Sequence, residues 1–198
     1  MELVWMRKLV YYIATSIDGY IAGPEGEYDF YPLADDMAAY LNGEYPETVP
    51  THIRAHVGLD APNKSFDTVV MGRGSYEPGL AAGVTSPYAH LRQYVVSGTI
   101  KSIDDPAVEL VPDDPLGLVR RLKREDGLNI YLCGGGNLAA QLLPEIDELI
   151  VKCYPVVAGA GIPAFHGAFA PTTFTLTGTR TFSNGAALMT YSRPASAG

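Results

Sequence analysis

Short apolar runs alternate with polar segments rich in glycine and proline along most of the chain. Runs of this length that are rich in β-branched and aromatic residues predict buried strands. We expect such strands at 8–14, 68–71, 93–97, 108–111 and 148–156, and directly before Gly134. Apolar residues with helical spacing predict helices over 34–41, 115–125 and 138–143. Strands that alternate with helices indicate an α/β fold with a largely parallel sheet.

The last part of the chain differs, because two β-rich runs within 173–192 flank the sequence Ser183-Asn184-Gly185. Asn-Gly is a strong signal for a tight hairpin turn. The predicted fold is therefore a single α/β domain over 1–198, with a mixed, mostly parallel central sheet, flanking helices and an antiparallel C-terminal hairpin. Residues 15–32 are expected to form a loop, and 42–66 a loop-rich segment with one helical turn.

Composition and charge exclude several classes of function. The net charge of −8 argues against sequence-independent binding to nucleic acid, and no apolar run is long enough to span a membrane. The N-terminal residues lack the pattern of a secretory signal. Cys133 and Cys153 lie in strand-like runs, which favours buried free thiols over a disulfide or a metal site. We therefore expect a cytoplasmic protein whose partners include neither nucleic acid nor a membrane.

The sequence LNIYLCGGGNL at 128–138 carries most of the chemical information, because an apolar strand runs into three glycines and a helix follows at once. Glycine lets the backbone approach a ligand closely, and a helix start offers free N–H groups that suit a phosphate. The spacing is neither that of a Rossmann fingerprint nor that of a P-loop. From these residues alone, a phosphate-binding turn and a tight turn without a ligand are equally open.

Two further patterns each have a chemical and a plain interpretation. His52 and His56 have the spacing of zinc ligands on a helix. Proline upstream and the absence of a glutamate after His52 favour solvated histidines, so no metal site is expected. Tyr28, Phe30 and Tyr31 could cover a planar substrate, although half-buried packing is the commoner role of such tyrosines.

Four motifs follow one another along nearly the whole chain. They are ATSIDGYIA at 14–22, VMGRGSY at 70–76, VVS at 95–97, and the glycine turn followed by DEL at 147–149 and PVVAGAGIPAF at 155–165. In this order the motifs resemble the dihydrofolate reductase-like family, and in particular the branch that contains the reductase domain of riboflavin biosynthesis. No zinc signature of a deaminase precedes them, so the resemblance is to the reductase half alone.

The resemblance implies that these loops lie at the carboxyl ends of strands and hold NADPH. Three glycines and the N–H groups after them would face the pyrophosphate, the second turn would bind further phosphate oxygens, and apolar side chains would line the nicotinamide. The implied cofactor-binding residues are Ala14, Ile21, Gly72, Arg73, Ser75, Ser97, Gly134, Gly135, Gly136, Asn137, Leu138 and Pro155.

Several of these residues have plainer roles available. Arg73 could be a solvated turn arginine, Ser75 a helix cap and Ser97 a strand-end turn residue. Asn137 stands where many reductases of this family have arginine or lysine, which leaves the preference for NADPH over NADH open.

The resemblance also implies a carboxyl group that organises protonation, at the start of the helix after the mobile loop. Asp35 is the first candidate for this catalytic role and Asp36 the second. Both could instead be first-turn helix acids that face water. Asp18, in the first motif, is expected to shape a turn.

The function implied is an NADPH-dependent oxidoreductase that transfers hydride to a small heterocycle of the pteridine or pyrimidine type, with 5-amino-6-(5-phosphoribosylamino)uracil reductase-type chemistry among the options. Residues 25–66 would form the substrate side, and the assembly expected is a homodimer. The alternative is a dinucleotide-binding or dimeric scaffold protein of the same fold without turnover.

Overall fold

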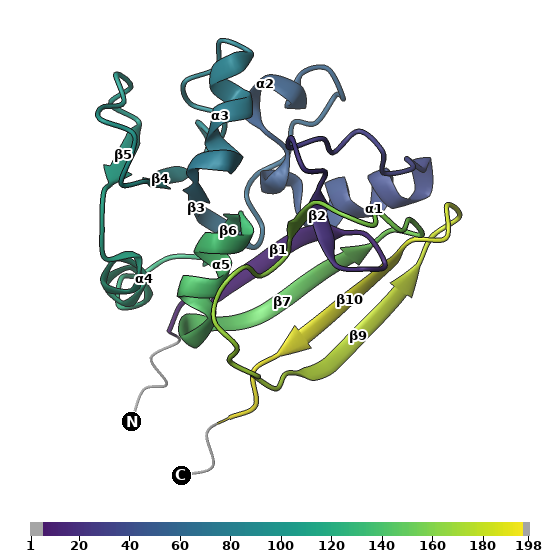
Figure 1. Ribbon diagram of the computed structural model, residues 1–198. Coiled ribbons are helices and arrows are strands. Elements are labelled where there is room, and N and C mark those ends of the chain that lie inside the picture. Colours follow the sequence, from purple (N-terminus) through teal and green to yellow (C-terminus); the bar gives the residue numbers. More distant parts are fainter. Residues whose placement is uncertain (1–5, 196–198) are drawn as a thin grey trace.

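A computed structural model describes residues 6–195 as an eight-stranded sheet with helices on both faces (Figure 1). Its strands are β1 (Leu9–Thr15), β3 (Phe66–Gly72), β4 (Arg92–Val96), β5 (Val108–Val111), β6 (Asn129–Gly134), β7 (Ile146–Cys153), β9 (Thr175–Thr181) and β10 (Ala187–Ser192). The strand order is β5-β4-β3-β6-β1-β7-β10-β9. The first six strands in this order run parallel, and β10 pairs antiparallel with both β7 and β9. The α/β fold with a mostly parallel sheet and an antiparallel C-terminal hairpin is thus confirmed.

The helices cover the two faces of the sheet in separate groups. They are α1 (Asp35–Glu44), α2 (Thr51–Arg54), α3 (Arg73–Ala81), α4 (Pro115–Lys123) and α5 (Gly136–Leu142), with 3-10 turns η1 (Pro46–Thr48) and η2 (Leu143–Glu145). Neighbouring strand residues point to opposite faces. Tyr12 accordingly packs in the cluster that contains Met37 of α1 and Tyr76 of α3, whereas Tyr11 packs with α4 and α5. None of these helices within residues 6–195 is long and apolar enough to cross a membrane.

The residues after β3 differ most from the prediction, since the expected Gly-Arg-Gly turn is the start of a helix. Gly72 is the N-cap of α3, and the helix continues past two glycines and Pro78. Glycine and proline oppose a helix locally. Tyr76 outweighs them, because its side chain is fully buried and its hydroxyl donates to the carbonyl oxygen of Thr85 at 2.6 Å.

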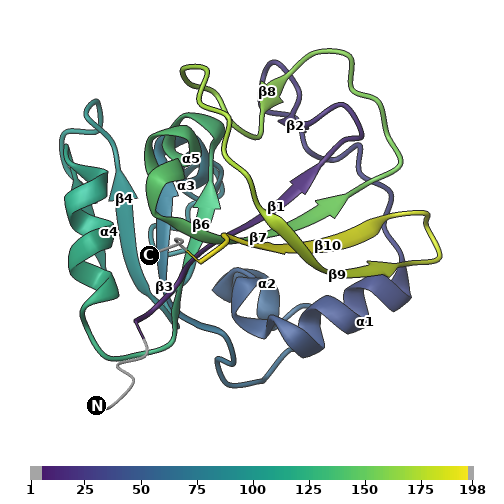
Figure 2. The same cartoon turned by 90° about the horizontal axis from the view of Figure 1, so that it is seen from below.

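A second small sheet lies where the sequence predicts no strand. Strands β2 (Tyr20–Ala22) and β8 (Ile162–Pro163) pair antiparallel, and Figure 2 shows them beyond the carboxyl end of β1. Each strand is too short to give a periodic signal, so only the tertiary pairing defines it. The other differences are shifts of boundaries: α5 begins two residues earlier than predicted, and 42–66 contains η1 and α2 instead of a single helical turn.

The C-terminal hairpin turns where the Asn-Gly sequence predicts it. Gly185 has a φ of +82°, which suits glycine, and its N–H donates to the carbonyl oxygen of Phe182. Asp36 in the first turn of α1 accepts from the backbone N–H of Ser183 at 2.9 Å and from its hydroxyl at 2.7 Å. The tip of the hairpin is therefore fixed to the start of α1.

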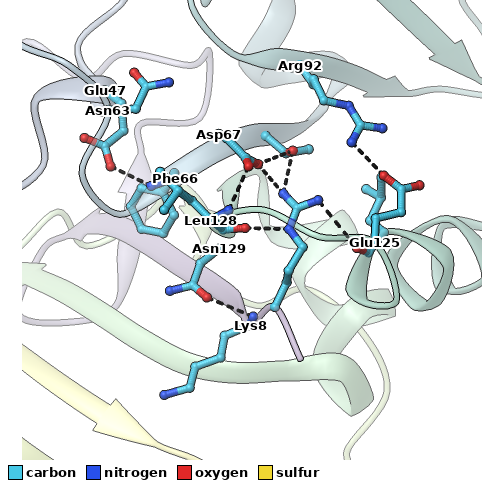
Figure 3. Close-up of polar contacts among 12 residues, drawn as sticks. Lys8, Glu47, Asn63, Phe66, Asp67, Arg92, Glu125, Leu128 and Asn129 are labelled. Carbon is cyan, nitrogen blue, oxygen red and sulfur yellow. Dashed lines mark hydrogen bonds and ion pairs between the residues drawn. The ribbon is translucent and has the colours of Figure 1, made fainter. Parts of the chain in front are cut away.

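A polar network holds the amino ends of three central strands together (Figure 3). Arg7 is buried and donates to the Asp67 carboxylate, the Thr68 hydroxyl and the carbonyl oxygen of Leu128. Glu47 is also fully buried, and its carboxylate accepts from backbone N–H groups at the start of β3. These charged groups lie at the amino ends of the strands, whereas the predicted cofactor loops lie at the carboxyl ends. They form hydrogen bonds with backbone N–H and C=O groups there.

Candidate functional site

Two glycine turns meet at the carboxyl ends of the adjacent strands β3 and β6. A Cβ atom placed on Gly72 would lie 3.3 Å from both the carbonyl oxygen of Gly134 and the nitrogen of Gly135, and 3.7 Å from Cβ of Leu138. The sequence predicted these turns separately, and the fold brings them into contact. Gly72 and Gly134 are both buried, so the backbones of β3 and β6 pack directly against each other at this end of the sheet.

The three consecutive glycines differ in what the structure around them requires. Gly134 has a φ of +118°, which side chains rarely tolerate. A Cβ atom on Gly136 would lie 2.1 Å from the carbonyl oxygen of Pro163, because the segment of β8 crosses the start of α5. Gly135 has an extended backbone, and its Cβ position meets only Cδ1 of Ile21 at 3.7 Å. Among the described residues, neither backbone strain nor packing therefore requires glycine at 135. The peptide bond between Gly134 and Gly135 is cis.

The residues at the start of α5 point in different directions. Asn137 is exposed, whereas Leu138 is 4% exposed and packs in the core between the sheet and α5. Only backbone groups of Leu138 can therefore meet a ligand. The helix has seven residues, so the free N–H groups of its first turn matter more here than a long macrodipole.

Arg73, Ser97 and Thr99 form a polar cluster beside the first glycine turn. The Arg73 guanidinium donates to the Thr99 hydroxyl at 3.3 Å, and the Thr99 and Ser97 hydroxyls lie 3.2 Å apart. Arg73 also faces Glu77 at 3.5 Å, and the side chain remains 54% exposed. Ser97 is buried and accepts from the N–H of Ile100 at 3.1 Å, so it shapes the turn as well. The cluster combines a cation with two hydroxyls at the carboxyl end of β4.

Ser75 faces the glycine turn across the end of β6. A Cβ atom on Gly134 would lie 3.6 Å from its hydroxyl oxygen, and among residues 6–195 no side chain caps the N-terminus of α3. Ser75 therefore does not cap the helix, which was the plainer role that the sequence left open for it.

The three residues predicted to line a nicotinamide are not equally placed. Ala14 is near the end of β1, and Ile21 reaches Gly135 from β2. Pro155 is exposed and lies beyond β7, where its ring is 3.4 Å from a Cβ position on Gly185 in the hairpin. The structure thus groups Ala14 and Ile21 near the glycine turn and leaves Pro155 on the far side of β1.

The two predicted acids lie on the surface at the start of α1. Asp36 is held by Ser183, and those hydrogen bonds lower the pKa of its carboxyl, which is the wrong direction for a proton donor at neutral pH. Asp35 is exposed and makes no side-chain hydrogen bond within residues 6–195. The partly buried carboxyl that the prediction assumed is therefore not found at either position, and a catalytic role for Asp35 stays a prediction.

Asp18 joins two of the motif loops. Its carboxylate accepts from the Ser16 hydroxyl at 2.6 Å and from the backbone N–H groups of Ala158 and Gly159 at 3.0 and 2.7 Å. These hydrogen bonds, that of Ser16 first, lower the pKa of Asp18 to about 2. The turn-shaping role expected of Asp18 agrees with these contacts, and it fixes the loop after β7 against the loop after β1.

The other patterns singled out in the sequence lie outside the glycine turns. The ring of His56 contacts the carbonyl oxygen of His52 at 2.9 Å, and residues 6–195 contain no group of three side chains that could hold a metal ion. Tyr31 stacks on Tyr154 with ring centroids 4.6 Å apart, whereas Tyr28 is 63% exposed. Both cysteines are free and partly buried.

Sequence reasoning missed two residues at this edge. Thr99, which links Arg73 to Ser97, gives no signal in the sequence beyond its position two residues after a strand end. Lys152 in β7 could have been found, because it lies on the same face of the strand as Ile150 and Tyr154, and that face is buried. A lysine on such a face is uncommon.

Solved structures with the same fold define the class of protein. The chain aligns with a putative riboflavin biosynthesis protein from Shewanella sp. PV-4 at a TM-score of 0.70 and 24% identity, over 95% of this chain and 99% of that one. It aligns with dihydrofolate reductase from Enterococcus faecalis, solved with NADP(H), at a TM-score of 0.64 and 15% identity, over 95% and 97% of the two chains. The fold is therefore that of the dihydrofolate reductase-like proteins.

The family is shown by the sequence itself. The sequence model of the RibD C-terminal domain matches residues 7–188, so the chain belongs to the RibD C-terminal domain family. Two relatives from Bacillus subtilis (strain 168) carry the names uncharacterized protein YwjB and uncharacterized protein YyaP. The first is 34% identical over 178 residues, covering 89% of this chain and 92% of the relative. The second is 27% identical over 200 residues, covering 93% and 94%.

A two-part enzyme shares the fold over only part of its length. This relative is a diaminohydroxyphosphoribosylaminopyrimidine deaminase/5-amino-6-(5-phosphoribosylamino)uracil reductase from Thermotoga maritima, which aligns at a TM-score of 0.63 and 14% identity. The alignment covers 96% of this chain and 57% of that one.

Proposed function

We propose that the protein is an NADPH-dependent reductase that transfers hydride to a small heterocycle of the pyrimidine or pteridine type. The observation that supports it best is the contact of the two glycine turns, at Gly72 and Gly134–Gly135, with Arg73 beside them. The pyrophosphate of a dinucleotide needs a protein backbone that it can approach closely and a cation nearby. Both are present at the carboxyl end of a parallel sheet, where ligands of α/β proteins bind.

The residues present fit NADPH. Gly72, Gly134 and Gly135 would face the pyrophosphate, and Gly135 is the glycine that packing within the chain does not require. Arg73, Ser97 and Thr99 would hold the 2′-phosphate, since a guanidinium and hydroxyls are good donors to phosphate oxygens. When bound there, NADPH would supply a hydride for the reduction of a double bond in the substrate.

The substrate class rests on the family and on the names of proteins with the same fold. A uracil-type heterocycle is the substrate in the name of one structural neighbour, and dihydrofolate in that of another.

Cofactor binding gives a first prediction. NADPH is expected to bind in the micromolar range, about 7–8 kcal/mol. Arg73→Ala should weaken NADPH by about 1–3 kcal/mol through loss of a charge-assisted contact, and NADH by much less. Arg124→Ala, an exposed residue at the end of α4, removes the same charge as a control. Calorimetry measures the affinities of the wild type and both variants for NADPH and NADH, six in all. Equal weakening of NADPH and NADH would show that Arg73 does not bind the 2′-phosphate.

Turnover is tested by following NADPH absorbance with a panel of pyrimidine and pteridine substrates. Oxidation of NADPH that depends on one of these compounds would support the reductase. Tight NADPH binding with no turnover of any compound would favour the alternative, a dinucleotide-binding protein without catalysis. Absence of binding at millimolar NADPH would refute both.

We also propose that two chains form a homodimer through the C-terminal hairpin. Strand β9 lies at the edge of the sheet, and almost all of its residues are exposed, with Leu176 at 52%. Exposed edge strands pair readily with other chains. Light scattering should give twice the chain mass of 21.2 kDa, and Leu176→Lys should shift the protein toward the monomer. A monomer at micromolar concentration would contradict the proposal.

A further inference from the structure

Lys152 is a lysine without an anionic partner on the proposed substrate side. Its ammonium nitrogen lies 4.1 Å from the centroid of the Tyr12 ring, and the side chain is half-buried. It makes no ion pair or hydrogen bond with any residue in 6–195. A charged group that leaves water normally gains a compensating partner within the protein. Because Lys152 has no such partner among these residues, its ammonium group is free to interact with a bound molecule.

The position of Lys152 places it beside the predicted hydride-transfer region. Lys152 is the register partner of Ala14 in β1, which is one of the two predicted nicotinamide-lining residues near the glycine turn. Tyr12 stands on the same face of β1, and Cys133 is the residue directly before Gly134 in β6. Because β6, β1 and β7 are neighbours in the sheet, these three side chains project together on the face covered by α1.

The groups around Lys152 leave it able to donate a proton. Burial lowers the pKa of Lys152 to about 8. The nearby thiol of Cys133 accepts from the Tyr131 hydroxyl at 3.3 Å, and burial raises the pKa of that thiol, so it stays neutral at pH 7. Burial also raises the pKa of Tyr12 and Tyr154. Lys152 is therefore the group on this face whose proton is both present at neutral pH and readily given up.

Resting on the reductase function proposed above, we propose that Lys152 is the proton donor of the reaction. The carbon of a C=N or C=O bond in the substrate accepts a hydride from NADPH, which leaves as NADP⁺. The π electrons of that bond move to the nitrogen or oxygen, which takes a proton from Nζ of Lys152. The neutral amine then regains a proton from water. Hydride and proton together complete a two-electron reduction.

Two variants separate the proton of Lys152 from its charge. With a substrate from the panel, Lys152→Met should lower kcat by about 10²–10⁴-fold, the usual effect of losing a general acid. Lys152→Arg keeps the charge, but a guanidinium holds its proton at any pH used here, so kcat should fall as in the methionine variant. The wild-type kcat should decline above about pH 8. A fully active Lys152→Arg, or a Lys152→Met with the wild-type rate and pH profile, would show that Lys152 is not the donor.

A titration without turnover provides the second readout. The five lysines of the chain are converted to ¹³C-dimethyl-lysine, and each resonance is followed with pH. The resonance that disappears in Lys152→Met should titrate near pH 8, well below the ordinary lysine value of about 10.4. If Lys152 instead titrates near about 10.4, the proposed donor is wrong whatever the panel shows.

Failure of the reductase and failure of the Lys152 assignment are distinguishable. A wild-type protein that turns over none of the panel refutes the reductase, and the donor role falls with it. An active wild type with an equally active Lys152→Met refutes only the donor, and Asp35→Asn or solvent water is then tested in its place.

Discussion

Arg7→Met is expected to lower the free energy of unfolding by about 3–5 kcal/mol, the usual result of removing one partner of a buried ion pair. Arg7 is 3% exposed, and its guanidinium binds Asp67, Thr68 and the carbonyl oxygen of Leu128. Methionine replaces the aliphatic part of the side chain and none of its donors. Those acceptors then lose their partner at the point where β1, β3 and β6 begin.

Urea titration followed by circular dichroism measures this loss. Because Asp67 keeps some contact with water, at 31% exposure, the result should fall at the lower end of the range. For a chain of this size the melting temperature should drop by roughly 6–12 °C. Arg92→Met is the matched control, because its ion pair with Glu125 is 47% and 33% exposed and should contribute at most about 1 kcal/mol. Equal losses in the two variants would show that burial of Arg7 adds nothing.

The sheet could be predicted from the sequence because each strand carries its own local signal. Runs such as 8–14 and 108–111 are apolar and β-branched, and the Asn-Gly turn identifies the hairpin without any other information. Helix α3 could not be predicted in this way. Gly74, Pro78 and Gly79 give a local preference against a helix, and the burial of Tyr76 in the core reverses it. That burial depends on strands and loops distant in sequence.

The candidate site divides in the same way. The glycine turns could be recognised from the residues that form them, but the contact between Gly72 and Gly134 depends on the pairing of β3 with β6. The family resemblance implies a carboxylate at a helix start as the proton donor, whereas the donor proposed from the structure is a lysine within a strand. Lys152 lies in the middle of an apolar run, and its relation to Ala14 follows only from the register of β1 with β7.

The second large effect is a contrast between neighbouring glycines. Gly136→Val should lower the free energy of unfolding by more than about 3 kcal/mol, the upper part of the range for overpacking. The added Cβ would lie 2.1 Å from the carbonyl oxygen of Pro163. Because that oxygen belongs to the backbone, the clash is relieved only if β8 moves away from α5. Gly135→Val should cost only about 1 kcal/mol, as for a poor N-cap residue, because its Cβ position meets one flexible atom of Ile21 at 3.7 Å.

Cofactor affinity should show the opposite order in the variants that fold. A side chain at 135 would project toward Ile21, into the space proposed for the pyrophosphate, so Gly135→Val should weaken NADPH at least about tenfold, or 1.4 kcal/mol. Thermal melting and calorimetry on the same samples give both quantities. If Gly135→Val keeps both its stability and its affinity for NADPH, the pyrophosphate does not lie against this turn. In that case the close approach of Gly72 to Gly134 serves only the packing of β3 on β6.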